Sequence, residues 1–242
     1  MDAQVFTEHF DLEDTHWWFR SKRTLILSLL RRYGVLGGPG LDVGCGAGGT
    51  LAVLARQGTW VSVDADPAAL ELSRRRGLAR LAGSGAEALP FRQGTFAACL
   101  CLDLLYHRNV VSESGVLREC HRVLRPGGLL LVTDSAFKWL RSAHDEAVHG
   151  ARRYTRRELV EQVRAAGFTP VLASYAYCLV FPVVAAVRLA RRGAAAGSDV
   201  FPLPRPLNTA LLGVQAVERA LLRVGPLPFG SSVVLVARKA AA

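Results

Sequence analysis

The stretch from residue 41 to residue 64, LDVGCGAGGTLAVLARQGTWVSVD, limits the fold of this chain more than any other part of it. An apolar run that contains Asp42 leads into a cluster of glycines, a helix-like stretch follows, and a second β-like run ends in Asp64. This order is typical of a βαβ unit that binds a nucleoside ligand. Glycines let the ligand approach the backbone, and the second acid can hold both ribose hydroxyls. The pattern predicts an open, doubly wound α/β sheet with its ligand at the carboxyl ends of the strands.

The glycines alone leave two classes of cofactor open. Residues 44–49 also satisfy G-x-G-x-x-G, so a nicotinamide or flavin dinucleotide competes, with its pyrophosphate on the helix N-terminus. Asp42 argues against that, because a carboxylate two positions before the first glycine repels a pyrophosphate and suits an ammonium or a sulfonium. The string D-x-G-x-G-x-G resembles the first motif of the class I S-adenosylmethionine (SAM)-dependent methyltransferases.

Three later segments extend this resemblance over roughly residues 16–177 and to a last strand. They are AEALPF at 86–91, LRPGG at 124–128, and the stretch from Arg153-Tyr154-Thr155 through Gly167-Phe168. Two positions depart from the family pattern. Gly85 stands where an Asp usually accepts from the adenine amino group, and Ala97 stands where an Asp usually follows the strand-opening Phe. Adenine recognition is then left to the backbone near Ala86 and to apolar side chains.

The resemblance implies SAM as the cofactor and a set of residues that hold it. Asp64 is expected to bind the ribose, Asp42 and the glycine loop the methionine end, and Leu102 with Asp103 to line the pocket near the sulfur. The run HWWF at 16–19 resembles the N-terminal segment of one branch, where Trp18 or Phe19 walls the pocket and Arg20 or Arg23 pairs with the methionine carboxylate. The predicted cofactor-binding residues are Trp18, Arg23, Asp42, Gly44, Cys45, Gly46, Gly48, Asp64, Ala65, Ala86 and Leu102.

Methyl transfer needs alignment of the acceptor, exclusion of water and, for some acceptors, removal of a proton. The candidate catalytic residues are His107, just past the fourth strand, His149, and Tyr154 a few residues further on, with His144 as a weaker candidate. A carboxylate acceptor needs no base, and Arg152 or Arg153 would then orient it. We expect a small-molecule substrate, but these residues do not show whether O-, N- or C-methylation follows.

Composition constrains the partners. The net charge of +10 comes mostly from arginines in short clusters, several of them near expected helix C-termini, and no RNA-binding motif is present. Nucleic acid is therefore an unlikely partner. The five cysteines are scattered without a C-x-x-C, so we expect free thiols and no metal site. Residues 1–13 lack an apolar stretch, which predicts no secretion signal and a cytoplasmic, or membrane-associated, location.

We expect one methyltransferase domain over residues 1–242, with a helical cap at 1–34 and a helical insertion at 178–230. Strands are predicted at 40–43, 60–63, 79–81, 96–102, 129–133 and 232–237, the last one antiparallel. Helices are predicted at 21–33, 49–57, 113–123, from Thr155 to Gly167, and at 207–223. The insertion is a lid for a lipophilic substrate, a peripheral membrane contact through 178–192, or simply packing on the sheet edge or a dimer contact. The oligomeric state stays open. Alternative functions are a nicotinamide-dinucleotide oxidoreductase and a non-catalytic SAM-fold binding protein.

Overall fold

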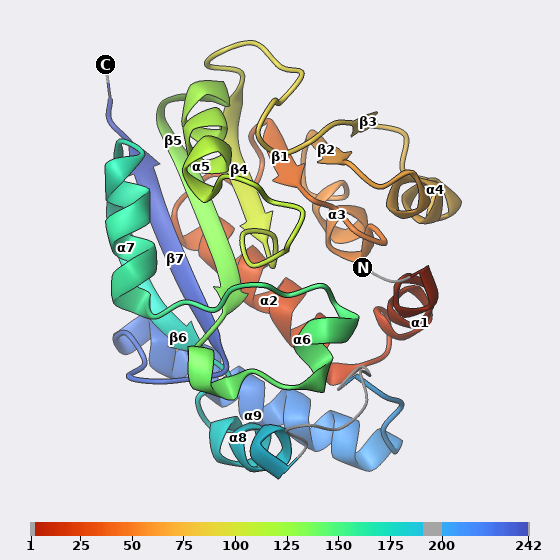
Figure 1. The fold of residues 1–242 in the computed structure, drawn as a ribbon. Coiled ribbons are helices and arrows are strands. Elements are labelled where there is room, and N and C mark those ends of the chain that lie inside the picture. The colour runs from red at the N-terminus through yellow and green to blue at the C-terminus, as the bar shows by residue number, and fades with distance from the viewer. Residues whose placement is uncertain (1–2, 191–199, 242) are drawn as a thin grey trace.

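The computed structural model describes residues 3–190 and 200–241. Within them, seven strands form one sheet in the order β3-β2-β1-β4-β5-β7-β6 (Figure 1). Six strands run parallel, and β7 lies antiparallel between β5 and β6. The predicted mostly parallel sheet with an antiparallel last strand is confirmed. The strands are β1 (Gly40–Val43), β2 (Trp60–Asp64), β3 (Leu81–Gly83), β4 (Phe96–Leu102), β5 (Leu124–Ser135), β6 (Phe168–Ala176) and β7 (Ser232–Lys239).

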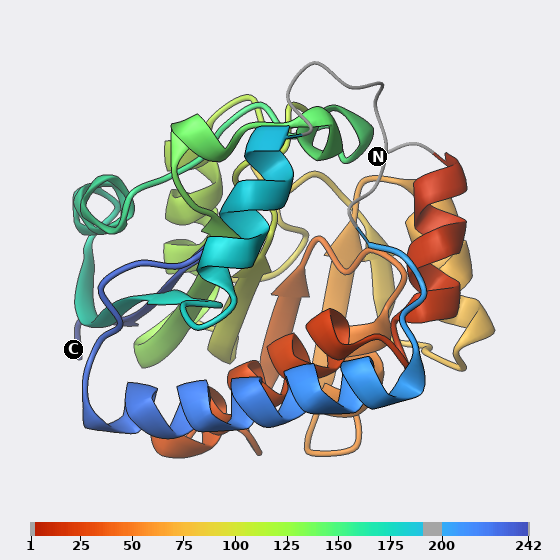
Figure 2. The same ribbon diagram turned by 90° about the horizontal axis from the view of Figure 1, so that it is seen from below.

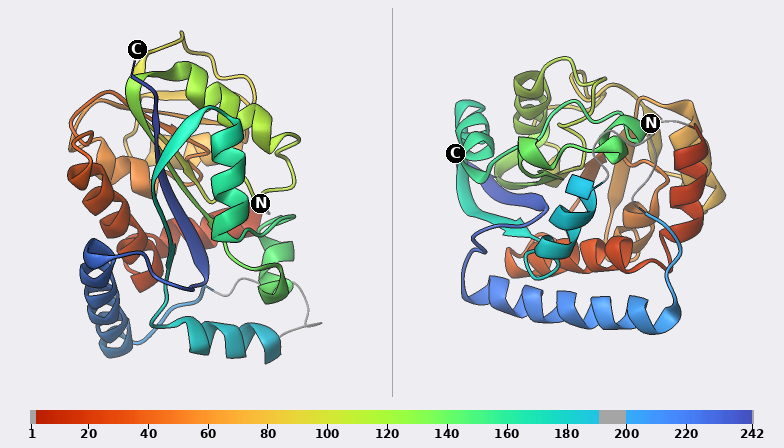
Figure 3. Two further views of the ribbon diagram at one scale, coloured as in Figure 1. Left: turned by 90° about the vertical axis from the view of Figure 1, so that its left-hand side faces the viewer. Right: turned by 60° about the horizontal axis from the view of Figure 1, so that its bottom comes forward.

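Helices cover both faces of the sheet (Figures 2 and 3). α2, α3 and α9 pack on one face, and α5 and α7 pack on the other. α1 lies against α4 beside the glycine loop, while α6 and α8 lie near the carboxyl ends of the strands (Figure 1). The helices are α1 (Ala3–Leu12), α2 (Trp17–Arg32), α3 (Gly49–Leu54), α4 (Pro67–Arg75), α5 (Glu113–Val123), α6 (Ala143–Ala147), α7 (Arg156–Ala165), α8 (Phe181–Ala190) and α9 (Arg205–Val224), with a short 3-10 turn η1 (Lys138–Leu140).

Strand β4 shows why the central strands read as continuous apolar runs. All seven of its residues are buried, because both faces of a parallel sheet are covered by helices. Successive side chains point to opposite faces. Cys99 and Cys101 belong to the core under α5 and α7, whereas Leu100 and Leu102 belong to the core under α2 and α3. Leu102 therefore faces the side on which the N-terminal helices lie.

Local signals place most element boundaries correctly. Asp66 caps α4 by accepting from the backbone N–H of Ala68 at 2.9 Å, and Thr155 with Glu158 forms a capping box at the start of α7. Helix α2 begins at Trp17, four residues earlier than predicted, because Nδ1 of His16 accepts from the backbone N–H of Trp18 and serves as its N-cap.

The clearest omission in the sequence-based prediction is β6. It forms the edge of the sheet, and its register shifts between Pro170 and Leu172. A proline has no backbone N–H to donate to a neighbouring strand, so it is tolerated at a sheet edge or at a bulge. Pro170 is the reason that the sequence pattern did not predict a strand here. Helix α1 was not predicted as a separate helix either.

The residues predicted as the insertion form α8 and α9. Helix α9 lies along α2 on the outside of the molecule (Figure 2). Arg191 and Arg192, part of the predicted membrane-contact segment, lie outside the described residues. None of the described helices combines the length and apolarity that crossing a bilayer would require.

Candidate functional site

The glycine loop between β1 and α3 needs glycine for its backbone. Gly44, Gly46 and Gly48 have φ angles of 80°, 54° and 81°, in the left-handed region that favours glycine. A Cβ on Gly48 would also lie 2.5 Å from the hydroxyl of Ser73. The loop is held to the end of β2, where the backbone N–H of Gly46 donates to Oδ2 of Asp64 at 2.9 Å.

A cavity of about 650 Å³ opens beside this loop at the carboxyl ends of the strands. It is lined by the predicted residues Trp18, Arg23, Asp42, Gly44, Cys45, Gly46 and Leu102. The predicted residues Gly48, Asp64, Ala65 and Ala86 do not line it. The sequence therefore predicted part of the lining of this cavity. The cofactor-binding roles assigned to all of these residues stay predictions.

Asp42 is the most unusual group in the cavity wall. It is 2% exposed, and burial raises its pKa from 3.8 to about 7. Its Oδ1 atom is buried and has no hydrogen-bond partner among the described residues. A buried acceptor without a donor is costly, which marks a place where a ligand can supply the donor. Asp42 can therefore receive a cationic group.

Asp64 is positioned differently. Its two carboxylate oxygens accept from the backbone N–H groups of Gly46 and Asp66, both at 2.9 Å. Each carboxylate oxygen retains a further lone pair, so the group can still accept from hydroxyls. These bonds fix the orientation of the side chain at the end of β2.

The N-terminal helices bring residues to the cavity that the sequence did not reveal as site residues. Nζ of Lys22 forms an ion pair with Asp103 and lies 5.0 Å from the ring centre of Trp18. The hydroxyl of Thr133 donates to the other oxygen of Asp103 at 3.2 Å. Asp103, predicted to lie near the cofactor sulfur, lines the cavity as a partner of Lys22.

Arg23 lines the cavity but is already engaged. Its guanidinium donates to the backbone carbonyl of Glu13 and lies 3.6 Å from Asp14. The carboxylate of Glu13 lies 3.0 Å from Arg76 and accepts from the backbone N–H of Gly49. An acidic side chain therefore occupies the start of α3, where a dinucleotide would place its pyrophosphate.

Two histidines lie in the cavity wall. Burial lowers the pKa of His9 to about 4 and that of His144 to about 3, so both are neutral at pH 7. Nε2 of His9 is buried and has no hydrogen-bond partner among the described residues. His144 was the weakest of the predicted histidines, and His9, on the unpredicted helix α1, was missed.

The three predicted catalytic residues do not line this cavity. The rings of His107 and His149 lie 5.7 Å apart, and Arg108 lies 2.9 Å from Nε2 of His149. Tyr154 is 3% exposed and donates to the backbone carbonyl of Leu105 at 3.0 Å, as well as to Glu113. Burial raises the pKa of Tyr154. Their catalytic roles stay predictions, but the geometry gives Tyr154 a structural task.

Arg153, predicted to orient a carboxylate acceptor, is also engaged. Its guanidinium donates to both oxygens of Asp145, at 2.7 and 2.9 Å, and both side chains are buried. A bidentate pair of this kind leaves little of the guanidinium for a substrate.

Apolar side chains form the rest of the cavity. They come from α8 and α9 and from the segments before them, and the principal ones are Leu179, Val183, Val187, Leu207, Leu211 and Val214. The cavity therefore has a polar end at the glycine loop and an apolar end at the two helices of the predicted insertion.

Comparisons with known proteins show what this chain is similar to. Residues 41–132 match the family model described as a methyltransferase domain. A demethylmenaquinone methyltransferase of Mycobacterium marinum is 36% identical over 137 residues, 55% of this chain and 56% of that protein. A ubiquinone biosynthesis O-methyltransferase of Methylocella silvestris is 38% identical over 98 residues, 37% of each protein. The chain spans about half or less of the length of these curated relatives.

A solved SAM-dependent methyltransferase of Thermotoga maritima superposes with a TM-score of 0.61 at 18% identity, covering 98% of this chain and 95% of that one. This likeness shows that the fold is shared. The resemblance to the class I SAM-dependent methyltransferases is confirmed by the matched domain together with the fold. The assignment to a branch with an N-terminal HWWF segment stays a prediction.

Proposed function

We propose, from the match of residues 41–132 to the methyltransferase domain model, that the protein transfers a methyl group from SAM to a lipophilic small molecule. The observation that carries the proposal is the two-ended cavity. A buried, unpaired acid lies at one end, beside the glycine loop, and an apolar wall from α8 and α9 lies at the other.

SAM supplies an activated methyl group on a sulfonium, which an acceptor atom displaces in line. The residues at the polar end fit such a ligand. The unpaired oxygen of Asp42 can accept from an ammonium, and Asp64 can accept from ribose hydroxyls. Arg23 can reach a carboxylate only by sharing its bonds with Glu13 and Asp14.

The apolar end supports a lipophilic acceptor. Two curated relatives are named for demethylmenaquinone and for ubiquinone biosynthesis. In this chain, the side chains of α8 and α9 can exclude water from the cavity and hold a hydrocarbon portion of the acceptor. The helical insertion thus acts as the substrate lid, and the cap at 1–34 covers the cofactor end.

His9 is the better placed of two candidate bases for an acceptor hydroxyl. Its imidazole is neutral at pH 7 and its Nε2 is buried in the cavity wall without a partner among the described residues. His144 is the second candidate, since it is neutral and lines the same cavity. Each can hold the proton that leaves the acceptor as the methyl group arrives.

The decisive experiment measures binding and transfer together. Calorimetry is carried out with SAM and with NADH, and transfer of radioactive methyl from SAM is followed into demethylated quinones of increasing chain length. We expect SAM binding, no NADH binding, and transfer that improves with chain length. Binding of NADH instead of SAM would support an oxidoreductase, which the carboxylate of Glu13 at the start of α3 disfavours. SAM binding without transfer to any acceptor would support a non-catalytic binding protein.

The role of His9 is tested by H9Q, with H107Q as the matched control outside the cavity. We expect H9Q to lower kcat by about tenfold, less than the typical contribution of a general base because burial lowers the pKa of His9 to about 4, with SAM affinity unchanged. An unchanged kcat in H9Q together with a loss in H107Q would reverse the assignment.

We also propose that α8 contacts an anionic membrane surface, from which a lipophilic acceptor can enter. No residue of α8 is fully buried, and Leu189, which does not line the cavity, is 42% exposed. Trp139 is exposed nearby, and the exposed Arg141 supplies a positive charge. Exposed apolar side chains gathered in this way mark sites of contact with a membrane.

Flotation with phosphatidylglycerol vesicles and with phosphatidylcholine vesicles tests this contact. We expect binding to the anionic vesicles, a loss in L189E, and no loss in V111E, because Val111 is 88% exposed in a loop far from α8 in the sequence; neither residue lines the cavity. Equal loss in both variants, or no vesicle binding at all, would refute the contact.

A further inference from the structure

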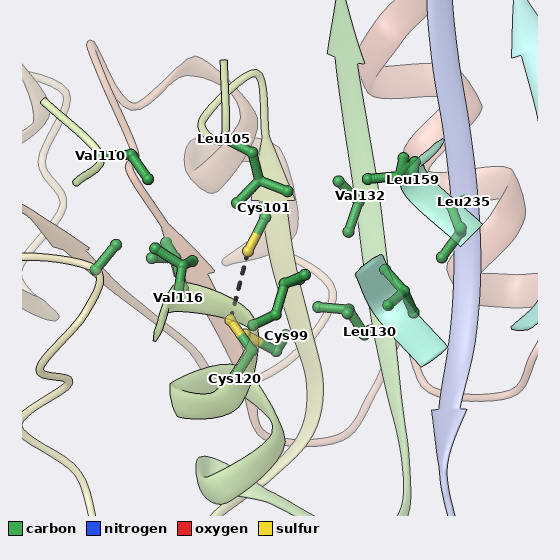
Figure 4. Packing of buried hydrophobic residues seen from close by; sticks show 14 of the residues in the cluster. Cys99, Cys101, Leu105, Val110, Val116, Cys120, Leu130, Val132, Leu159 and Leu235 are labelled. Carbon is green, nitrogen blue, oxygen red and sulfur yellow. Dashed lines mark hydrogen bonds between the residues drawn. The ribbon is translucent and has the colours of Figure 1, made fainter. Parts of the chain in front are cut away.

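Three thiols meet in the core on the face of the sheet opposite to the cavity wall. Cys99 and Cys101 are two residues apart on β4, so both point to the same face, and Cys120 reaches them from the inner face of α5 (Figure 4). All three residues are 0% exposed. Their sulfur atoms lie within 4.8 Å of one another, and the sulfurs of Cys101 and Cys120 are 3.5 Å apart. The sheet and the helix thus hold three soft donor atoms around one point.

The surroundings restrict which ion these sulfurs can hold. Among the described residues, no fourth cysteine, histidine or carboxylate joins the group. The neighbours in the same core are apolar, among them Leu105, Val116 and Leu130 (Figure 4). Structural zinc requires four ligands, and calcium or magnesium requires oxygen ligands. Three thiols match a soft ion that accepts three sulfur ligands, and an apolar shell favours a low ionic charge.

We propose that Cys99, Cys101 and Cys120 form a binding site for a soft monovalent cation of the Cu(I) class. Binding displaces one thiol proton to solvent, which leaves a neutral complex of Cu(I) with one thiolate and two thiols, and it involves no change in oxidation state because the ion enters as Cu(I). The site is separate from the proposed methyl-transfer cavity, since none of the three cysteines lines that cavity.

Such an ion links β4 to α5 and acts on folding. Ligands that bind only the native state stabilise it, and a metal centre held by thiolates does so strongly. With free Cu(I) at about 100 times its dissociation constant, Tm is expected to rise by about 5–10 °C.

The test uses the full chain, reduced and free of oxygen, titrated with Cu(I) against a chromogenic Cu(I) chelator. The variants are C99A, C101A and C120A, with C178A as the matched control, because Cys178 is also buried but belongs to the other core. We expect one Cu(I) per chain, three sulfur neighbours in X-ray absorption, and affinity at least about tenfold weaker in each of the three variants. C178A is expected to bind as the wild type does.

Melting curves without copper show whether each variant folds, and the sulfur count in the wild-type protein does not depend on any variant. Retention of all copper by the chelator would overturn the proposal. Equal weakening in C178A, or copper held by fewer than three sulfurs, would overturn it as well.

Discussion

The substitution D42N is expected to separate stability from cofactor binding. Burial raises the pKa of Asp42 from 3.8 to about 7, which corresponds to a destabilisation of the native state of about 4 kcal/mol when the group is ionised. Because this pKa is raised on folding, the cost is absent below pH 3.8, grows between pH 4 and pH 7, and is constant above pH 7. An uncharged Asn removes that cost, so its benefit is larger at high pH.

The gain in the free energy of unfolding of D42N at pH 8 is expected to exceed its gain at pH 5 by about 2–3 kcal/mol. For a chain of this size, that difference corresponds to about 5–10 °C in Tm, which calorimetry or circular dichroism of the ligand-free protein resolves. The same variant is expected to lose affinity for SAM, because an Asn cannot neutralise an ammonium.

The affinity of the wild-type protein for SAM is also expected to depend on pH. Below pH 7 Asp42 must lose its proton to pair with a cation, so the dissociation constant for SAM improves by up to about tenfold per pH unit and levels off above pH 7. Titration calorimetry in buffers of different ionisation enthalpy measures the released proton directly. A D42N protein with the same pH dependence of Tm as the wild type, and with unchanged SAM affinity, would refute the reasoning.

Three further outcomes follow from the same geometry. E13A breaks the ion pair of side chains that are 13% and 10% exposed, and is expected to cost about 1–3 kcal/mol in urea unfolding, because Arg76 keeps Asp14 as a partner at 2.8 Å. E71A, from a pair exposed by 65% and 57%, is expected to change the free energy of unfolding by less than about 1 kcal/mol; equal effects would contradict this. G48A places a Cβ at a residue with a φ of 81° and close to Ser73, whereas G77A places one at a residue with a similar φ and open space around it. G48A is therefore expected to destabilise the protein more than G77A, and the difference between their denaturant midpoints measures the cost of the contact with Ser73. Equal midpoints would show that this contact costs nothing. Y154F is expected to lose about 1–2 kcal/mol of stability and to keep its kcat, and a lost kcat with unchanged stability would restore its predicted catalytic role.

The sequence predicts those parts of the site that depend on local order. The spacing of Asp42, the glycines and Asp64 is set within one βαβ unit, and the structure has the strands and the turn as predicted. The central strands could also be predicted from the sequence, because a strand that is buried on both faces consists of an unbroken run of apolar residues. The edge strand β6 was hidden by Pro170, whose position is tolerated only because no strand lies beyond it in the described sheet.

The acid–base groups of the cavity could not be predicted in this way. His107 was chosen because it follows the end of β4, but the turn after β4 pairs it with Gly150 and leads it away from the cavity wall. His9 and Lys22 reach the cavity only because α1 and α2 fold over the carboxyl ends of the strands. Apart from the resemblance of the HWWF run at 16–19, no local pattern in residues 3–32 indicates that orientation, since it depends on packing against distant elements.

One residue links α9, in the predicted insertion, to the start of α2, in the predicted N-terminal cap. Asn208, in the first turn of α9, accepts from the backbone N–H of Trp17 at 2.7 Å and donates to the backbone carbonyl of Thr15 at 3.0 Å. These bonds fix the entry into α2, the helix that carries Trp18 and Lys22 into the cavity. The proposed lid over the apolar end and the proposed cap over the cofactor end are therefore joined at the start of α2. Displacement of α9 by an entering acceptor would shift Trp18 and Lys22 as well, so the binding free energies of acceptor and cofactor should be coupled in both directions.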